Sequence, residues 1–127
     1  MQGCIACNKC GELGRCVFRD ELYDTLHGKL AGADGLVVGS PTYNGQLYPP
    51  VDALLRKIAE RCIPHRRFAC FGSFTWAGAA VRRMTEFAEG MKWPVVGAPV
   101  ELKQGYSTAV EPACRTLVDA LVEDMKR

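Results

Sequence analysis

The chain has 127 residues, of which 48% are hydrophobic and 24% are charged, and its formal net charge is +2 at pH 7. This length fits one globular domain, and the small net charge gives no reason to expect nucleic acid or an acidic membrane surface as a partner. The sequence contains no apolar run of about 18 residues, so we expect no membrane-spanning helix. The first residues lack the basic region and apolar stretch of a signal peptide, which predicts a cytoplasmic location.

Four of the seven cysteines lie close together at the start of the chain. Cys4, Cys7, Cys10 and Cys16 follow the spacing C-x2-C-x2-C-x5-C. In a cytoplasmic chain, such a group indicates metal or redox chemistry rather than disulfides. Four thiolates can hold a 4Fe–4S cluster, and the three-plus-one grouping favours it over zinc, whose sites more often use two separated pairs. Redox-active thiols without a metal are the remaining alternative.

The other three cysteines are scattered along the rest of the chain. Cys62, Cys70 and Cys114 stand among apolar residues, and we predict that they are buried as small hydrophobic side chains. Because the four clustered cysteines all lie near the start of the chain, we divide the single domain into a cysteine-rich cluster loop, residues 1–19, and an α/β body, residues 20–127.

After the cysteine cluster, helical and strand patterns alternate. The spacing of apolar residues predicts helices over residues 20–32, 49–62, 79–90 and 110–125. Short apolar runs predict strands over residues 35–39, 67–71 and 95–100. Strands that alternate with amphipathic helices imply right-handed crossovers and a parallel sheet with helices on both faces. The expected fold class is therefore a three-layer α/β/α arrangement with three recognisable strands.

Two predicted loops follow the carboxyl ends of strands, where open parallel sheets bind ligands. The first loop contains Ser40, Pro41, Thr42, Tyr43, Asn44 and Gly45, and the second contains Gly72, Ser73, Phe74, Thr75, Trp76 and Gly78. Aromatic rings can stack on a flat heterocycle, and backbone N–H groups of small residues can approach its polar edge, so a flavin would suit this pair of loops. The alternative is that Tyr43, Phe74 and Trp76 pack as ordinary loop residues over the sheet edge.

These residues resemble two related families of flavoproteins. The cysteine cluster and the stretch through Gly39-Ser-Pro-Thr-Tyr resemble the iron–sulfur flavoproteins and their NADPH-dependent FMN reductase relatives. The stretch from Gly39-Ser-Pro-Thr-Tyr-Asn-Gly through Phe71-Gly-Ser-Phe-Thr-Trp-Ala-Gly is similar to the flavodoxin domain of flavodiiron (A-type) flavoproteins. Together the two resemblances cover nearly the whole chain.

The resemblance implies a flavodoxin-like fold, noncovalent FMN and one- or two-electron transfer. It implies that Cys4, Cys7, Cys10 and Cys16 bind a 4Fe–4S cluster, and that the loops 42–45 and 73–78 embrace the flavin ring. The sequence departs from the family because the first strand and the phosphate-binding loop have no counterpart, so the fold is N-terminally truncated relative to the family pattern. A homo-oligomer, or pairing with a chain that supplies the missing first strand, would cover the exposed sheet edge.

We therefore expect an oxidoreductase that transfers electrons between a cluster and FMN. Its donor or acceptor would be a redox partner protein or NAD(P)H. One alternative is an NAD(P)H-dependent flavin or quinone reductase whose cysteines have lost their role. The other is a metal-stabilised, non-enzymatic module that has lost flavin binding. No general acid or base stands out in the sequence.

Overall fold

The computed structural model describes residues 6–13, 17, 28–30, 32–60, 67–105 and 107–127. Most of the predicted helix over residues 20–32 lies outside this range. Within the described residues, the strands are β1 (Gly35–Tyr43), β2 (Gln46–Leu47), β3 (Arg67–Phe74) and β4 (Val100–Lys103). The helices are α1 (Cys10–Leu13), α3 (Pro49–Glu60), α4 (Ala80–Gly90) and α5 (Glu111–Met125), and a 3-10 turn over Thr108–Val110 precedes α5.

The strands form one sheet in the order β2-β1-β3-β4. β1, β3 and β4 are parallel, with Gly35 opposite Arg67 and Phe71 opposite Val100. The short β2 pairs antiparallel with the end of β1, so that Thr42 lies opposite Leu47. The predicted α/β fold with a parallel core is confirmed, and β2 is an addition that the sequence analysis did not include.

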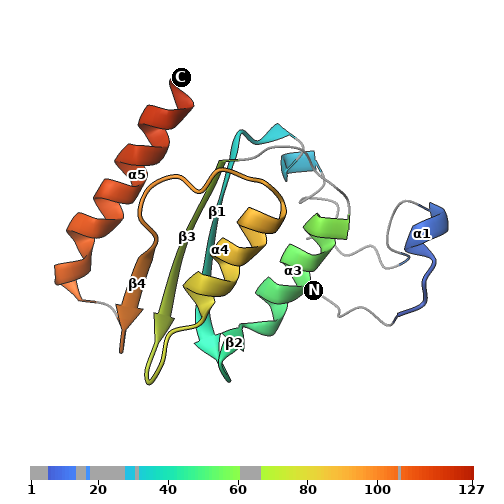
Figure 1. Cartoon of the computed structure of the whole chain (residues 1–127), viewed down its shortest axis with the longest axis horizontal. Coiled ribbons are helices and arrows are strands. Elements are labelled where there is room, and N and C mark those ends of the chain that lie inside the picture. Colours follow the sequence, from blue (N-terminus) through green and yellow to red (C-terminus); the bar gives the residue numbers. More distant parts are fainter. Residues whose placement is uncertain (1–5, 14–16, 18–27, 31, 61–66, 106) are drawn as a thin grey trace.

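Helices cover both faces of the sheet, as the alternating pattern predicts (Figure 1). On one face, Phe68 and Cys70 of β3 are fully buried in a cluster with residues of α3 and α4, among them Leu55 and Met84. On the other face, Ala69 of β3 packs in a second cluster with Val100 of β4 and with residues of α5. Successive residues of β3 thus point to opposite layers, as a strand covered on both faces requires.

The last strand lies further along the chain than its apolar residues predict. We expected it over residues 95–100, but β4 runs from Val100 to Lys103. Val95 makes one isolated bridge with Phe68, and the chain then turns at Gly97, whose φ is +73°. A left-handed residue cannot continue a strand. Because the strand starts later than expected, it also ends later, at Lys103 rather than at Val100. The residues that follow its carboxyl end are therefore those after Lys103.

The prediction for the scattered cysteines is partly wrong. Cys70 is buried, as expected, whereas Cys114 is exposed; Cys62 lies outside the described residues. Cys114 belongs to a long apolar stripe on α5, but of α5 only Leu117 and Leu121 are buried. Val118, Val122 and Met125 are exposed. None of the helices among the described residues is long and apolar enough to cross a membrane.

Candidate functional site

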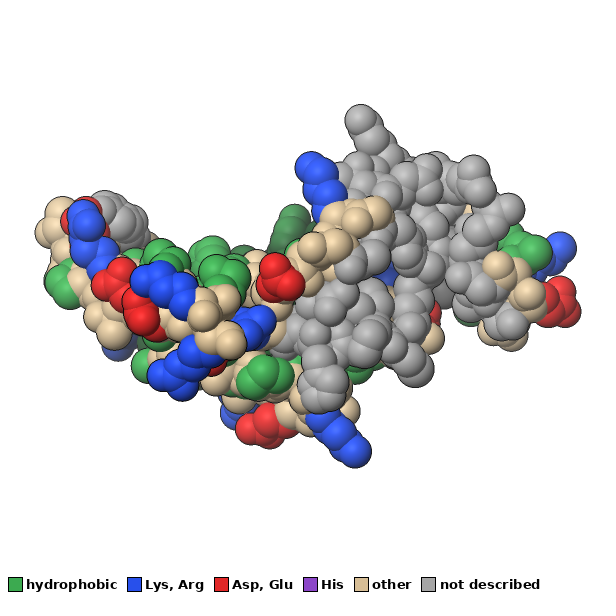
Figure 2. Space-filling view, turned by 90° about the horizontal axis from the view of Figure 1, so that it is seen from above, with side chains coloured by type: hydrophobic (Ala, Val, Ile, Leu, Met, Phe, Trp, Pro, Cys, Tyr) green, Lys and Arg blue, Asp and Glu red, His purple; other side chains and the backbone are tan. Residues whose placement is uncertain are grey.

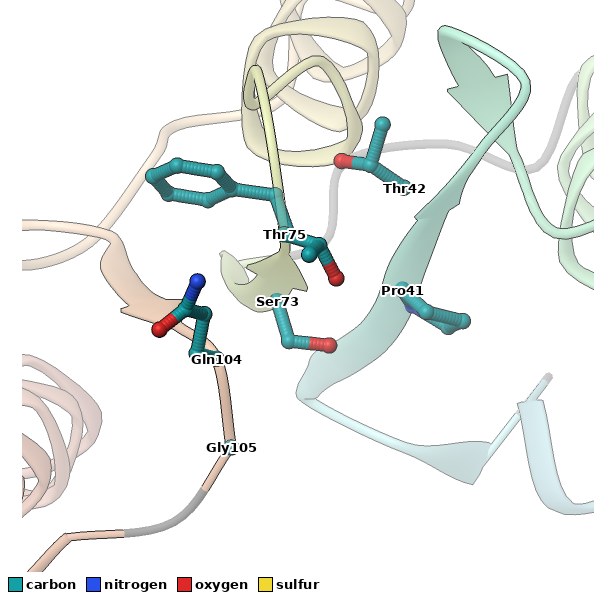
Figure 3. A pocket seen from close by; sticks show the side chains of 7 residues that line it. Pro41, Thr42, Ser73, Thr75, Gln104 and Gly105 are labelled. Carbon is teal, nitrogen blue, oxygen red and sulfur yellow. The ribbon is translucent and has the colours of Figure 1, made fainter.

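A cavity of about 360 Å³ lies where the three parallel strands end. It is lined by residues from the ends of β1 and β3 and from the segment after β4 (Figure 3). These residues are Pro41, Thr42, Ser73, Phe74, Thr75, Gln104 and Gly105. The carboxyl ends of parallel strands are the usual ligand site of an open α/β sheet, so the fold places this cavity where chemistry is expected.

Thr42 connects two of the elements that form the cavity. Its hydroxyl oxygen accepts hydrogen bonds from the backbone N–H groups of Ala79 and Ala80, both at 3.1 Å. These are N–H groups at the start of α4, where a helix has no internal acceptor for them. A residue of β1 thus caps a helix that follows β3. Thr42 therefore holds the two predicted loops at a fixed separation, in addition to lining the cavity.

Two other predicted site residues, Ser40 and Gly72, make structural contacts near the cavity. The Ser40 hydroxyl is buried, accepts a hydrogen bond from the Tyr48 backbone N–H at 3.0 Å and donates one to the Pro41 carbonyl at 2.8 Å. At Gly72, an added Cβ would lie 3.1 Å from both the Ser40 carbonyl oxygen and a methyl group of Val81. The Ser40 hydroxyl thus ties β1 to the residue before α3, Gly72 allows β1, β3 and α4 to approach closely, and neither residue lines the cavity.

The rest of the first predicted loop lies beside the cavity. Asn44 and Gly45 have φ values of +49° and +70° and form the two-residue turn between β1 and β2. An Asn-Gly pair of this kind is the preferred turn for a tight hairpin. The Tyr43 ring is half exposed and packs edge-on against Tyr48, with 6.1 Å between ring centroids.

Beyond Thr75, the second predicted loop leaves the cavity. Trp76 is 92% exposed, so its ring neither packs on the sheet edge nor lines the cavity. Gly78 lies against Glu101 of β4, because an added Cβ would collide with the Glu101 carboxylate. Of the twelve predicted loop residues, the structure brings five together around the cavity: Pro41, Thr42, Ser73, Phe74 and Thr75.

Gln104 and Gly105 line the same cavity but were absent from our predicted site. They follow β4 directly, in the same position that Thr75 occupies after β3. The sequence contained a signal for this position: residues 100–103 alternate between apolar and charged side chains, as a strand does, and Gln104 and Gly105 follow them. It was missed because the third strand was expected over residues 95–100, which places its carboxyl end several residues too early.

The lining residues are uncharged, and more of them are polar than apolar. None of the seven is charged; Pro41 and Phe74 are apolar, whereas Ser73, Thr75 and Gln104 offer hydroxyl and amide groups. Ligand sites combine mostly apolar walls with a few placed polar groups and span roughly 300–1,000 Å³. The cavity is at the small end of that range, so it fits one flat heterocycle such as a flavin ring better than a whole dinucleotide.

The predicted cluster ligands lie mainly outside the described residues. Cys4 and Cys16 belong to undescribed segments, Cys7 is exposed, and Cys10 is the first residue of α1. In the part of the chain that the structure describes, no group of three or more histidine, cysteine, aspartate or glutamate residues could hold a metal ion. The four-cysteine site therefore stays a prediction.

No protein-family model matches the chain, but individual relatives do. It is 25% identical over 104 residues to rubredoxin-oxygen oxidoreductase of Megalodesulfovibrio gigas, an alignment that covers 82% of this chain and 26% of that protein. It is 40% identical over 63 residues to an iron–sulfur flavoprotein of Methanocaldococcus jannaschii, covering 50% of this chain and 30% of the relative. The chain thus spans less than a third of either relative's length.

A solved structure of a flavodoxin from the domain Archaea matches the fold. The TM-score is 0.73 at 21% identity, and the match covers 84% of this chain and 75% of that one. This likeness confirms the flavodoxin-like α/β/α fold, and the two sequence relatives confirm the resemblance to both flavoprotein families.

Proposed function

We propose that the chain binds FMN and transfers electrons through it, because its fold is flavodoxin-like and its sequence relatives include a rubredoxin-oxygen oxidoreductase and an iron–sulfur flavoprotein. The observation that carries this proposal is the uncharged cavity at the carboxyl ends of β1, β3 and β4. Its apolar walls suit the faces of the flavin ring, and its hydroxyl and amide groups suit the polar edge.

The protein's own part in this function is to hold and orient the ring. Phe74 and Pro41 supply apolar walls, while Ser73 and Thr75 place hydroxyl groups beside them. Thr42 keeps β1 and α4 at a fixed distance, so the walls on either side are preorganised. Bound FMN would supply one- or two-electron transfer, whose potential a protein adjusts by burial and hydrogen bonding.

We further propose that Cys4, Cys7, Cys10 and Cys16 bind a 4Fe–4S cluster that exchanges electrons with the flavin. The support is the number and spacing of the thiolates and the resemblance to a relative named an iron–sulfur flavoprotein. The cytoplasm, which the sequence predicts, would keep these thiols reduced. The external donor or acceptor would be a redox partner protein or NAD(P)H.

One face of the sheet suggests how the protein associates. Val37 of β1 and Phe71 of β3 are 51% and 45% exposed and lie on the face that α5 covers only over β3 and β4. Among the described strands, residues 35–41 of β1 pair on one side only, with β3. An apolar face beside an open edge favours association. We propose that a second copy, or a chain that supplies a further strand, covers it.

A titration with FMN tests the proposed cofactor. Flavin would be removed from the purified protein, and FMN fluorescence would be followed as the apoprotein is added. We expect saturable binding that Thr75→Trp abolishes, because the larger side chain fills the cavity. Thr108→Trp, at an exposed position outside the cavity, serves as the matched control and should bind normally. No binding by the unsubstituted chain, or equal binding by both variants, would refute the proposal.

A further inference from the structure

The segment after β4 forms a third wall of the cavity, next to the walls that β1 and β3 supply. Gln104 and Gly105 line the space together with Ser73 and Pro41. Figure 3 shows Gln104 on one side of Ser73 and Pro41 on the other. The site is therefore bounded by three successive parallel strands rather than by two.

The backbone of this third wall has a conformation that is unfavourable for its sequence. Gln104 has a φ of +60° and Gly105 a φ of +95°. Glycine adopts such angles freely, but a residue with a Cβ is destabilised there. The Gln104 backbone N–H is anchored by a hydrogen bond to the Phe74 carbonyl at 2.9 Å, which fixes the direction in which its side chain leaves the chain.

Lys92 provides an instructive comparison within the same molecule. It also has a positive φ, +57°, but it lies immediately after Met91, the C-cap of α4, and its N–H bonds to the Glu89 carbonyl at 3.0 Å. Left-handed residues commonly end helices, so the conformation of Lys92 has a structural reason. At Gln104 no helix ends: the residue directly follows β4 and turns the chain out of the strand together with Gly105, at the edge of the cavity, where strained residues are common when the cavity is functional.

The side chain at this position differs chemically from its neighbours. Among the seven lining residues, Gln104 alone carries N–H groups on its side chain; amide N–H groups are donors, and the amide carbonyl is an acceptor. A flavin ring presents carbonyl oxygens along its polar edge. A glycine at position 104 would adopt the same turn without strain, so the glutamine contributes its side chain rather than its backbone.

We propose that Gln104 is a ligand-binding residue whose amide N–H donates a hydrogen bond to a carbonyl oxygen of the flavin ring, an inference that rests on the proposed FMN site. Gly105 lets the chain turn away without placing a side chain in the cavity. The left-handed backbone at Gln104 serves to direct this amide toward the ligand.

Two glycine substitutions separate binding from backbone strain. Gln104→Gly and Lys92→Gly each replace a left-handed residue with glycine, so we expect similar shifts in Tm. Only Gln104→Gly should weaken FMN binding, with Kd raised about threefold to tenfold, the range for one lost hydrogen bond. Gln104→Glu keeps the shape but removes the N–H donor, and it should weaken binding at least as much.

The outcomes distinguish this inference from the function on which it rests. If the unsubstituted chain binds FMN and both Gln104 variants bind it equally well, Gln104 is not a ligand-binding residue, while the proposed function stands. If Gln104→Glu alone binds normally, the side chain fills space and donates no hydrogen bond, so the proposal is wrong. If the unsubstituted chain takes up no FMN, the proposed function and this inference fail together.

Discussion

The hydroxyl oxygen of Thr42, near the end of β1, accepts a hydrogen bond from the backbone N–H of Ala80, the first residue of α4. The same oxygen accepts a second hydrogen bond, from Ala79. One side chain thus satisfies two N–H groups at a helix start and joins two segments that are 38 positions apart in the sequence.

Replacing Thr42 should therefore destabilise the protein and loosen the cavity. Thr42→Val keeps the shape of the side chain but leaves both N–H groups without their acceptor. We expect the free energy of unfolding to fall by about 1–2 kcal/mol, the usual cost of a lost helix cap. Urea unfolding measures this change, and Thr42→Ser, which retains the oxygen, should recover most of it. Equal losses in the two variants would contradict the capping role.

Gly97 should tolerate substitution less well than Gly45, although both have positive φ values. Alanine at either position incurs a left-handed backbone cost of about 1–2 kcal/mol. At Gly97 the new Cβ would also lie 2.9 Å from the Leu117 Cδ1 atom, whereas nothing lies within 4 Å at Gly45. Because Leu117 is a buried residue of α5 in the core cluster with Ala69 and Val100, urea unfolding should show a larger loss for Gly97→Ala. Equal losses of unfolding free energy in Gly97→Ala and Gly45→Ala would mean that α5 moves to accommodate the new Cβ at no cost, which would contradict this prediction.

Stability should decline at alkaline pH because of Cys70. Burial raises the pKa of the Cys70 thiol above its ordinary value of 9.0, and the contact with the Thr85 hydroxyl offsets part of this rise. The unfolded chain therefore loses this proton at a lower pH than the folded protein does. Its contribution to stability is intact below about pH 9 and is lost as the pH rises toward the folded-state pKa.

Two alanine variants isolate this effect. Thermal unfolding between pH 7 and alkaline pH, roughly one unit or more above the usual thiol pKa, should show a smaller decline for Cys70→Ala than for the unsubstituted protein. Cys114→Ala removes an exposed thiol and should leave the decline unchanged. An identical pH dependence in all three proteins would rule out a contribution from the Cys70 thiol.

The exposed face around Val37 and Phe71 should control association. Val37→Lys places a charge on an already half-exposed position, so the free energy of unfolding should change by only about 0.5 kcal/mol. Sedimentation velocity should show a shift toward smaller species. Ala59→Lys, an equally drastic change at an exposed position on α3, should leave the distribution as it was. The proposed interface would be excluded by a Val37→Lys variant that associates normally.

The charges on the described part of the face shown in Figure 2 offer no simpler explanation for association. In Figure 2, lysine and arginine side chains are interspersed with aspartate and glutamate on the described part of the visible face. The formal net charge of +2 agrees with this mixture. Charge alone therefore does not select one partner here, and the apolar face is the stronger candidate for contact with another protein.

Much of the fold follows from local patterns in the sequence. Leu55 and Ile58 of α3 and Met84 and Ala88 of α4 recur with helical spacing, and all four are buried. The apolar run at 35–39 forms part of β1 as expected. Periodicity predicts such elements because the buried face of a helix or strand must be apolar.

The errors arose where long-range contacts decide the structure. Ser40–Tyr43 was predicted as loop because its residues favour turns, but pairing with β3 and β2 extends β1 through Tyr43. The exposure of Cys114 depends on which residues of α5 meet the sheet, and these are Leu117 and Leu121. The contribution of Gln104 to the cavity depends on where β4 ends, and a single left-handed residue, Gly97, shifted that strand.

The most direct test of the central claim is a cofactor analysis of the chain after anaerobic purification. A visible absorption spectrum would be recorded, and flavin, iron, inorganic sulfide and zinc would be assayed on the same sample. The account predicts flavin absorption bands, about one FMN and about four irons per chain, as a four-cysteine cubane site requires. A colourless protein that carries zinc and takes up no added FMN would contradict it.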